Sequence, residues 1–527
     1  MKKRLASLLE VLQPSAISLA GDPEISGIGY DSRTIREGDL FVAFSGLHSD
    51  GHDHVDEAIA RGAVAIVHDK PISDPHPGIS YLLVADARLS MAPLAAALHD
   101  YPSASLRIIG VTGTEGKSTT VSLIYQLLRM AGAKAGFFST VMSDTGSGQK
   151  PNPEHQTTPE ATTVQKMLAE MRDSSYDYAI VESSSHGLSE RTGRLSCVDF
   201  DIGIMTNVTS EHLEFHGTWE KYRHDKANLF RNLDAHNHEK LVGGKRTTIP
   251  SCGVVNADDP SALYFKACTA KPVYSYSTRG ASASLSALEI VGDKKGSSFI
   301  IEANESLDGQ GKSLRLPARI NLPGEFNIAN SLAALIAVSA ALVRPWHEFL
   351  PLLPGLRPVR GRMMNIERGQ PFEVIIDYAH TPSSFESILP PLRKRVEGKL
   401  FCLFGSGGER DTEKRPRQGE VASRFCDIVI LTDEDPRGED PMALLEDIAS
   451  GCGNLERGEK LFLIPDRPTA IRKAFSMAGA GDAVLLLGKG HENSIIYADR
   501  TVPYDEETEA LAALRDLGFS ADPIPGF

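Results

Sequence analysis

The sequence predicts an α/β protein of several domains, and three observations support this prediction. A glycine-rich motif, Gly113-Thr-Glu-Gly-Lys-Ser-Thr119, stands between an apolar segment (Leu106–Val111) and a helical pattern over residues 120–128. Near the C-terminus, four short apolar runs each end in a polar or glycine-rich turn. Such runs are typical of parallel strands that helices cover on both faces. The third observation is length, because 527 residues are too many for a single hydrophobic core.

Three regions follow one another along the chain. Residues 1–103 predict a small α/β domain that starts with an amphipathic helix and closes with a helix over Ser90–Asp100. Residues 104–354 predict a central domain with a parallel sheet, and residues 355–527 predict a third domain of repeated strand–loop–helix units. Four prolines between 345 and 358 predict a stiff connection between these two domains.

The central region contains a regular succession of expected elements. They are a helix over 160–172, strands Tyr178–Glu182 and Phe200–Met205, a β-rich stretch over 298–322, and a helix over 327–343.

Composition and charge exclude several classes of protein. The formal net charge is −14, from 69 acidic and 55 basic residues, which disfavours general binding to nucleic acid or anionic membranes. Six scattered cysteines without a CxxC pair are typical of a reducing cytoplasm, where we expect this protein. No run of about 18 uncharged apolar residues occurs, so we expect no transmembrane helix.

The glycine-rich motif predicts an ATP site. Gly113 and Gly116 allow a tight turn whose backbone N–H groups face an anion, and the N-terminus of the following helix adds positive charge. Lys117 supplies a cation for the β- and γ-phosphates, and Ser118 supplies a hydroxyl for Mg²⁺.

Phosphoryl transfer depends on positioning and charge neutralisation, so further cation ligands are expected near the phosphates. Glu182, at the end of a buried strand, and His212, in the loop after the next strand, are candidates. Lys226 by itself is typical of a helix surface.

Polar loops follow the four apolar runs of the third region. The runs are Glu373–Ile376, Leu400–Phe404, Asp427–Leu431 and Ala483–Leu487. Open α/β sheets bind ligands beyond the carboxyl ends of parallel strands. The loops therefore predict a second binding surface, and an ATP site with a separate polar cleft suits an enzyme that joins two substrates.

An ordered set of motifs resembles the Mur ligase family, most closely its tripeptide synthetase members, over nearly the whole chain. The motifs are Gly113–Thr119, Glu182–Leu188, Thr206–Lys226, Gly324–Asn330, Gly361-Arg362, Asp377–Pro382 and Gly488–Glu492, with Asp31–Arg33 and Gly38–Gly51 before them. Each motif is moderately specific, and the ordered set is very specific. The resemblance implies a uridine-nucleotide (UDP-MurNAc) domain, residues 1–103, a central P-loop ATPase domain, residues 104–354, and a Rossmann-like amino-acid-binding domain, residues 355–527.

The resemblance implies ATP-dependent amide formation in peptidoglycan precursor synthesis. ATP would phosphorylate the D-Glu carboxylate of UDP-N-acetylmuramoyl-L-Ala-D-Glu, and the amine of a diamino acid would displace phosphate from the acyl phosphate. The implied cofactors are ATP, Mg²⁺ at two sites and a carboxylated Lys226. We expect a cytoplasmic monomer with no nucleic-acid or membrane partner.

Residue roles are implied position by position. The catalytic residues and metal ligands would be Lys117, Ser118, Glu182, His212 and Lys226. The ATP-binding residues would be Gly113, Thr114, Glu115, Gly116, Lys117, Ser118, Thr119, Asn327, Asn330, Arg362, Asp377 and His380. The UDP-substrate would contact Ser32, Leu47, His48, Ser49, Thr157, Thr158, Ser184 and Arg194, with Arg191 as the alternative to Arg194. Glu115 stands where the family usually has Asn and brings a carboxylate near the triphosphate.

A loop of the third domain resembles the loop that selects the added amino acid in the family, and it supports a diamino acid. The amino-acid-binding residues would be Arg410, Glu434, Asp435, Pro436, Arg437, Gly488 and Glu492. Members that add meso-diaminopimelate typically read Asp-Asn-Pro-Arg where this chain reads Glu434-Asp-Pro-Arg437. Arg437 suits a substrate carboxylate, whereas Asp435 adds negative charge where a side-chain amine would sit. Meso-diaminopimelate, L-lysine and L-ornithine all remain open.

Three other functions compete with this interpretation. Folylpolyglutamate synthase shares the P-loop but is not expected to carry Asp31–Arg33 or the loop at Arg437. The sister enzyme that adds D-Ala-D-Ala is disfavoured by the Glu434–Arg437 loop. A catalytically silent nucleotide-binding scaffold is favoured only by Glu115. Nothing in the third domain resembles the switch or base motifs of a simple kinase or GTPase.

Overall fold

The computed structural model describes residues 2–46, 49–152, 156–209, 213–242, 244–293, 295–304, 314–453 and 455–520. The chain divides into two units, residues 1–356 and 357–527. The sequence places the start of the last domain at residue 355, two residues before this division.

The first sheet of the larger unit contains five strands in the order β2-β7-β6-β5-β4. Neighbouring strands β4 to β7 are parallel, and β2 is antiparallel to β7. The elements of this part are β1 (Lys3–Arg4), α1 (Leu5–Leu9), β2 (Ala16–Ser18), β3 (Glu24–Ile25), β4 (Gly27–Gly29), β5 (Asp39–Ala43), α2 (Val55–Ala60), β6 (Ala65–His68), β7 (Ser80–Leu83) and α3 (Ala87–Leu98). The first helix is one short turn that follows a strand, and the closing helix begins three residues earlier than expected because Asp86 caps it.

The second sheet has eleven strands in the order β11-β10-β9-β12-β8-β13-β16-β17-β18-β19-β20. The first elements of this part of the chain are β8 (Arg107–Thr112), α4 (Lys117–Met130), β9 (Ala135–Phe138), β10 (Met142–Asp144), β11 (Lys150–Pro151), α5 (Ala161–Asp173), β12 (Tyr178–Glu182), α6 (Ser185–Leu188) and β13 (Ile202–Met205). The later ones are α7 (Leu213–His216), α8 (Trp219–Asn232), β14 (Glu239–Val242), β15 (Lys245–Thr248), β16 (Cys252–Asn256), α9 (Ala262–Lys266), β17 (Val273–Ser277), β18 (Leu285–Asp293), β19 (Gly296–Ala303), β20 (Leu314–Ile320) and α11 (Glu325–Leu342).

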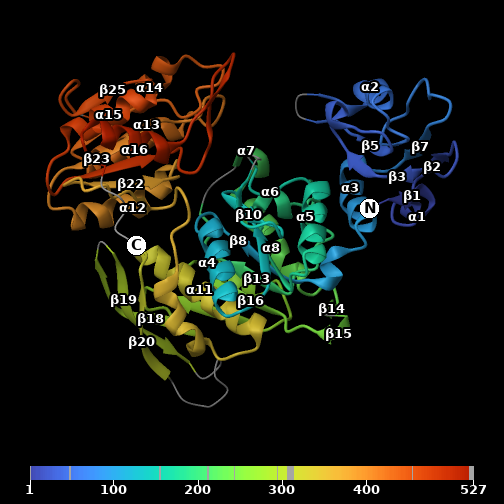
Figure 1. Cartoon of the computed structure of the whole chain (residues 1–527), viewed down its shortest axis with the longest axis horizontal. Helices are drawn as coiled ribbons and strands as arrows, with labels where there is room; N and C mark the ends of the chain where they lie inside the picture. The colour runs from blue at the N-terminus through green and yellow to red at the C-terminus, as the bar shows by residue number, and fades with distance from the viewer. Residues whose placement is uncertain are drawn as a thin grey trace. The chain divides into compact units, whose positions relative to one another are not determined.

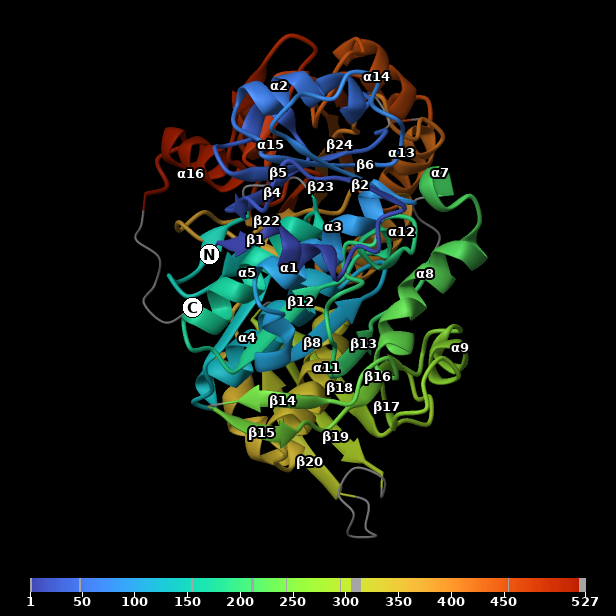
Figure 2. The same cartoon turned by 90° about the vertical axis from the view of Figure 1, so that its right-hand side faces the viewer.

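The expected parallel sheet is therefore mixed. The central strands β9, β12, β8, β13, β16, β17 and β18 are parallel to their neighbours in that order. Strands β10, β11, β19 and β20 are antiparallel at the two ends. In Figure 2 the strands β12, β8, β13 and β16 lie side by side, and the hairpin of β14 and β15 stands apart from them. The order β12-β8-β13 matters most, because it places the carboxyl ends of three motif-bearing strands next to one another.

The proline-rich segment is not the stiff connection that the sequence predicts. It forms a 3-10 helix, η4 (Trp346–Gly355), whose Trp346, Phe349 and Leu353 side chains are buried in the core of the larger unit. Proline supplies a suitable φ for this tight helix, and the apolar residues between the prolines are what hold the segment in the core.

Helix α11 packs along α4 beside the sheet (Figure 1). By length and composition it is the one described helix that qualifies as a membrane span, but 72% of its apolar window is buried inside the unit. Its apolar residues are thus used in the core, and its polar Asn327 and Asn330 lie near the end that approaches the glycine-rich motif.

The smaller unit contains a six-stranded sheet in the order β21-β22-β26-β23-β24-β25. Its elements are β21 (Met364–Asn365), β22 (Glu373–Asp377), α12 (Pro382–Arg395), β23 (Leu400–Phe404), α13 (Lys414–Phe425), β24 (Ile428–Leu431), α14 (Pro441–Ala449), β25 (Leu461–Leu463), α15 (Arg467–Met477), β26 (Ala483–Leu487), β27 (Ser494–Ile496), β28 (Thr501–Pro503) and α16 (Glu506–Asp516). All strands of this six-stranded sheet are parallel except β21. The four apolar runs are confirmed as neighbouring parallel strands, so their polar loops share one edge.

Candidate active site

The glycine-rich motif is closely enclosed by two other segments. A Cβ atom at Gly113 would lie 1.8 Å from Thr206 Oγ1, and one at Gly116 would lie 2.7 Å from Asn330 Oδ1. Both glycines also have positive φ angles, +155° and +80°. The motif thus requires glycine for conformation and for space.

Asn207, in the loop after β13, fixes the shape of the motif. Its backbone oxygen accepts a hydrogen bond from the Thr114 N–H at 2.9 Å, and its side-chain oxygen accepts one from the Glu115 N–H at 2.8 Å. The first N–H groups of any helix lack an acceptor within that helix, so the start of α4 is the natural anion site. Lys117, at the start of α4, donates from Nζ to the Thr114 carbonyl at 2.7 Å. Thr119 lies in the same turn and is partly exposed.

Ser118 and Glu182 come together as expected. The buried Ser118 hydroxyl donates to Glu182 Oε1 at 3.0 Å, and Glu182 is only 1% exposed. Thr140, which the sequence analysis missed, donates to both carboxylate oxygens, from Oγ1 at 3.0 Å and from its backbone N–H at 2.8 Å. A hydroxyl and a carboxylate beside a phosphate-binding loop are the oxygen donors that Mg²⁺ prefers, so these residues fit a magnesium site.

Lys226 is buried, in contrast to a typical lysine on a helix surface. It is 1% exposed on α8, its Nζ donates to the Gly113 carbonyl at 2.6 Å, and it lies over the Tyr222 ring, 4.4 Å from the centroid. Lys226 therefore touches the glycine-rich motif directly. The other expected ligand on this side, His212, lies outside the described residues.

Asn330 also lies at the glycine-rich motif and the helix that follows it. Its Oδ1 accepts a hydrogen bond from Thr120 Oγ1 at 3.2 Å. Asn327, three residues earlier on α11, is buried and donates to the Pro323 carbonyl at 2.7 Å. The structure thus brings Asn330 to the motif and uses the amide of Asn327 to hold the start of its own helix.

Residues expected to bind the UDP-substrate fall into two groups. Thr158 Oγ1 donates to the Glu182 carbonyl at 3.0 Å and accepts from the Ser184 N–H at 3.0 Å, so Thr158 and Ser184 both lie next to Glu182. Arg194 donates to the Thr158 carbonyl at 2.8 Å and pairs with Glu160 at 2.6 Å. The alternative residue, Arg191, instead donates to the Phe215 carbonyl at 3.0 Å.

The second group lies in the first domain. Ser32 is buried and donates to Glu57 at 2.7 Å, and Ser49 is exposed and bonds to His54 at 2.9 Å. Thr157 belongs with the first group, next to Thr158, and is partly exposed. Leu47 and His48 lie outside the described residues.

The smaller unit carries three residues that are expected at the nucleotide. Asp377 ends β22 and accepts backbone hydrogen bonds from Met363 and Ala379, both at 2.7 Å. Burial raises the pKa of Asp377, and these bonds together with Arg362 only partly oppose that rise. Arg362 lies over the Tyr378 ring at 4.7 Å, and the His380 ring lies 4.8 Å from the same ring. Arg362 and His380 thus lie against the Tyr378 ring, and Asp377 directly precedes Tyr378 in the sequence.

The loops expected to bind the amino acid also meet at this sheet edge. Gly408 N–H donates to the Asp435 carbonyl at 2.8 Å, which joins the loop after β23 to the loop after β24. Arg437 has a positive φ of 54° and its N–H donates to the Ile496 carbonyl. Arg410 is exposed in the loop after β23. Pro436 and Gly488 lie in the loops after β24 and β26.

Comparison with known proteins identifies the family. Models of the Mur ligase family catalytic domain, the Mur ligase middle domain, and the Mur ligase glutamate ligase domain match residues 24–99, 111–338 and 361–490. The UDP-N-acetylmuramyl-tripeptide synthetase of Treponema denticola is 51% identical over 93% of this chain and 92% of its own length. The chain belongs to the Mur ligase family.

Two further relatives of this Mur ligase agree with that assignment. The UDP-N-acetylmuramoyl-L-alanyl-D-glutamate–2,6-diaminopimelate ligase of Geobacillus kaustophilus is 37% identical over 98% of this chain and 100% of its own. A solved structure of an enzyme with the same name superposes with a TM-score of 0.60 and 28% identity, covering 94% of this chain and 95% of that chain. The expected three-domain α/β architecture is therefore confirmed.

Sequence reasoning missed a hydrogen-bonded chain beside Lys226 in this Mur ligase. His216 bonds through Nδ1 to Asp225 Oδ2 at 2.8 Å and through Nε2 to Ser185 Oγ at 3.0 Å. Burial raises the pKa of Asp225, but hydrogen bonds from His216 and Lys221 outweigh it and hold the pKa below its ordinary value. All three members are at most 7% exposed. These hydrogen bonds tie α8, which carries Lys226, to the start of α6, the short helix that follows Glu182.

Replacing Asp225 tests how much this chain contributes to stability. We expect Asp225→Ala to lower the free energy of unfolding by about 1–3 kcal/mol, because the buried His216 ring loses its carboxylate partner. The measurement is urea unfolding followed by circular dichroism. Lys221→Ala is the matched control, since it removes only a half-exposed partner of Asp225 and should cost less than about 1 kcal/mol. Equal losses in the two variants would contradict this role for His216.

Asp433, at the end of β24, predicts a pH dependence of stability. Burial raises its pKa to about 6 from an ordinary 3.8, and the hydrogen bond from the Tyr497 hydroxyl at 3.0 Å only partly opposes this rise. A carboxyl with a raised pKa stabilises the fold when protonated, and this contribution is lost as pH rises through about 6. The free energy of unfolding of Asp433→Asn, taken relative to wild type, should therefore be about 1–2 kcal/mol higher at pH 8 than at pH 5. Urea unfolding at both pH values measures it, and a constant difference would contradict the assignment.

A histidine cluster at the amino end of β13, away from the carboxyl ends that carry the motifs, does not form part of this site. Side-chain ligand atoms of Asp201, His236 and His238 lie within 4.8 Å of one another. The ammonium of Lys240, however, already lies 2.5 Å from Asp201 Oδ2 and donates to two backbone carbonyls. The carboxylate thus has its cation within the chain, and the cluster is a buried structural ion pair.

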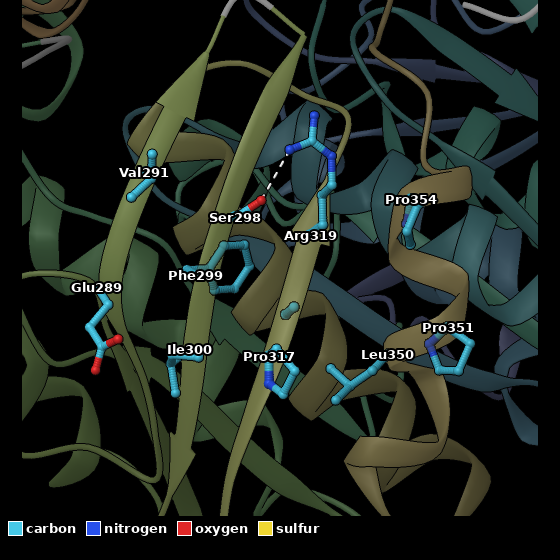
Figure 3. A pocket seen from close by; sticks show the side chains of 11 residues that line it. Glu289, Val291, Ser298, Phe299, Ile300, Pro317, Arg319, Leu350, Pro351 and Pro354 are labelled. Carbon is cyan, nitrogen blue, oxygen red and sulfur yellow. Dashed lines mark hydrogen bonds between the residues drawn. The ribbon is translucent and has the colours of Figure 1, made fainter.

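A groove of about 600 Å³ is also separate from the site. It lies between the strands β18 to β20 and helix η4, and Figure 3 shows Leu350, Pro351 and Pro354 facing the strands across it. Arg319, on β20, donates to Ser298 at 3.0 Å within the groove. None of the residues that line the groove is one of the expected site residues.

Proposed function

We propose that this Mur ligase adds a diamino acid to the D-Glu carboxylate of UDP-N-acetylmuramoyl-L-Ala-D-Glu, with ATP as the energy source, in peptidoglycan precursor synthesis. One observation carries the proposal: the Ser118–Glu182 pair and the buried Lys226 meet at the same glycine-rich loop. Close similarity to a tripeptide synthetase over almost the whole chain supports it.

The loop and its neighbours would bind and orient the ATP phosphates. The first-turn N–H groups of α4 would hold phosphate oxygens, and Lys117 would neutralise the phosphoryl group that is transferred. Ser118 and Glu182 would hold one Mg²⁺, which supplies charge neutralisation when bound. His212 would hold a second Mg²⁺ together with Lys226.

Lys226 would act as a carboxylated residue. Its neutral amine would add CO₂, forming an N–C bond and releasing one proton, so that a cation becomes an oxygen donor. The contact of Nζ with the Gly113 carbonyl places this group at the phosphate loop. Lysine that remained an ammonium here would add a positive charge beside a metal site instead.

The reaction itself needs an activated carboxylate. The D-Glu carboxylate would attack the γ-phosphorus, and ADP would leave. The amine of the diamino acid would then attack the acyl phosphate, lose a proton and expel phosphate. The UDP-substrate would be positioned by Thr157, Thr158, Ser184, Arg194, Ser32 and Ser49. The nucleotide would be lined by Asn327, Asn330, Arg362, Asp377 and His380. The three domains would be residues 1–103, 104–354 and 355–527.

The protein would act in the cytoplasm as a monomer without a membrane or nucleic-acid partner. The acidic net charge of −14 and the scattered cysteines support this assignment.

Phosphate release tests the function. The assay contains ATP, Mg²⁺ and UDP-N-acetylmuramoyl-L-Ala-D-Glu, with meso-diaminopimelate, L-lysine or L-ornithine supplied separately and product mass confirmed. We expect turnover with at least one of the three. Turnover only with a folate plus glutamate, or only with D-Ala-D-Ala, would assign the chain to a sister activity, and no turnover at all would support a silent scaffold.

A further inference from the structure

A buried lysine lies among the carboxylates of the expected amino-acid site. Lys489, in the loop after β26, is 1% exposed, and its Nζ lies 2.9 Å from Asp435 Oδ1 and 2.5 Å from Glu492 Oε2. Burial lowers the pKa of Lys489, but the two carboxylates outweigh burial and raise it above its ordinary value. Lys489 is therefore a permanent cation between the loops after β24 and β26.

Asp435 and Glu492 are satisfied by groups of the protein itself. Asp435 Oδ1 also accepts a hydrogen bond from the Ile496 N–H at 3.0 Å, and its side chain is only 13% exposed. Glu492 Oε1 accepts a hydrogen bond from the Tyr378 hydroxyl at 3.2 Å. The ammonium of Lys489 thus occupies the position at which Asp435 would meet an ammonium group of a ligand.

Glu434 differs from Asp435 and Glu492. Its Oε2 atom is buried and has no hydrogen-bond partner among the described residues. It faces Gly488, where a Cβ atom would lie only 2.8 Å from Oε2, so glycine leaves the carboxylate its room. A buried carboxylate oxygen without a partner is unfavourable, and an ionic or hydrogen-bonding partner relieves that cost.

We propose that Lys489 determines specificity by neutralising Asp435 and Glu492, which leaves Glu434 as the carboxylate that binds the side-chain ammonium of the diamino acid. This inference rests on the proposed function and deepens it. It replaces the expectation that the negative charge of Asp435 meets the substrate amine. The charge of Asp435 is paired within the protein, whereas Glu434, one residue earlier, keeps a buried carboxylate oxygen without a hydrogen-bond partner among the described residues.

Two neighbouring charge-removing substitutions test the proposal. Glu434→Gln and Asp435→Asn each replace a carboxylate by an amide of the same shape in the full-length enzyme. The readout is kcat/KM for each accepted diamino acid relative to its analogue without the side-chain ammonium: L-lysine against L-norleucine, L-ornithine against L-norvaline, and meso-diaminopimelate against L-2-aminopimelate. Glu386→Gln, at an exposed carboxylate on α12, controls for the loss of one negative charge.

We expect Glu434→Gln to reduce the preference for the ammonium-bearing substrate by about 10- to 100-fold, mainly through KM. Asp435→Asn should change that preference by less than about threefold, because Lys489 keeps its contact with Glu492. A preference that survives Glu434→Gln, or is lost in Asp435→Asn, would overturn the proposal.

A double substitution tests the part played by Lys489. In Glu434→Gln/Lys489→Met, Asp435 and Glu492 lose their internal cation, so part of the ammonium preference should return compared with Glu434→Gln alone. Absence of any recovery in a folded double variant would overturn the role of Lys489. Should Lys489→Met prevent folding, Lys489→Gln replaces it in the same comparison. If wild type turns over none of the three diamino acids, the proposed function has failed; if wild type is active and the single variants behave alike, only this inference has failed.

Discussion

Lys226→Ala should abolish ligation while leaving a folded protein that still binds the UDP-substrate. We expect kcat to fall by at least about 1,000-fold, which corresponds to roughly 4 kcal/mol of lost transition-state stabilisation. The reason is position: Lys226 is buried and its Nζ contacts the Gly113 carbonyl of the phosphate loop at 2.6 Å. The measurements are phosphate release and isothermal titration calorimetry with UDP-N-acetylmuramoyl-L-Ala-D-Glu.

Three comparisons separate carboxylation from simple packing. Lys226→Arg keeps the positive charge but cannot form the same carbamate, so it should be as inactive as the alanine variant. Added bicarbonate should rescue neither. Lys166→Ala, at an exposed lysine on α5, is the control and should retain wild-type activity. Full activity in Lys226→Ala or Lys226→Arg would refute the carboxylated-lysine role.

Arg467→Met should destabilise the smaller unit by about 3–5 kcal/mol. Arg467 and Glu506 form an ion pair at 2.7 Å in which both side chains are 0% exposed. Removing one partner leaves a buried charge uncompensated. Arg467 also donates to the carbonyls of Asp433 and Leu487, at 3.2 and 2.7 Å, and so holds the starts of the loops that carry Glu434 and Lys489. We therefore also expect a higher KM for the diamino acid, measured at a temperature at which the variant is folded.

Arg472→Met is the matched control for this prediction. Arg472 lies on the same helix, α15, and pairs with Glu509 and Asp516 of the same neighbouring helix, α16, but it is 43% exposed. Its loss should cost less than about 1 kcal/mol. In Arg467→Met/Glu506→Leu the buried charges are removed together, so much of the lost stability should return. Similar unfolding free energies for the Arg467 and Arg472 single variants would contradict the assignment.

Local patterns predicted the elements that position the site. The apolar runs at Tyr178–Glu182 and Leu400–Phe404 form strands with those bounds, because a buried parallel strand must be continuously apolar and its polar loop marks its end. The motif at Gly113–Thr119 was recognised for a similar reason, since its glycines are required by backbone geometry. The antiparallel ends of the central sheet were not predicted, because pairing direction depends on distant partners that a local pattern does not contain.

The sequence does not predict which of these side chains are buried or which residues they contact. The local sequence around Lys226 is typical of a lysine on a helix surface, and only the family resemblance implies a role for it. The fold buries Lys226 against the glycine-rich motif. The proline-rich segment at 346–355 read as a connection, whereas its Trp346 and Phe349 are core residues. In both cases the local sequence does not show burial, because the elements that cover these residues lie far away in the chain.

The sequence by itself determined the family, the strand–loop–helix order and the residue types available for phosphate and cation binding, because these follow from local spacing. The tertiary structure decided which charges remain available to a ligand. Asp435 and Glu434 are adjacent and chemically alike in the sequence, yet Asp435 pairs with Lys489 from a loop 54 residues away, and Glu434 Oε2 has no partner among the described residues. Electrostatic availability depends on distance and desolvation between side chains, and only the folded chain fixes these.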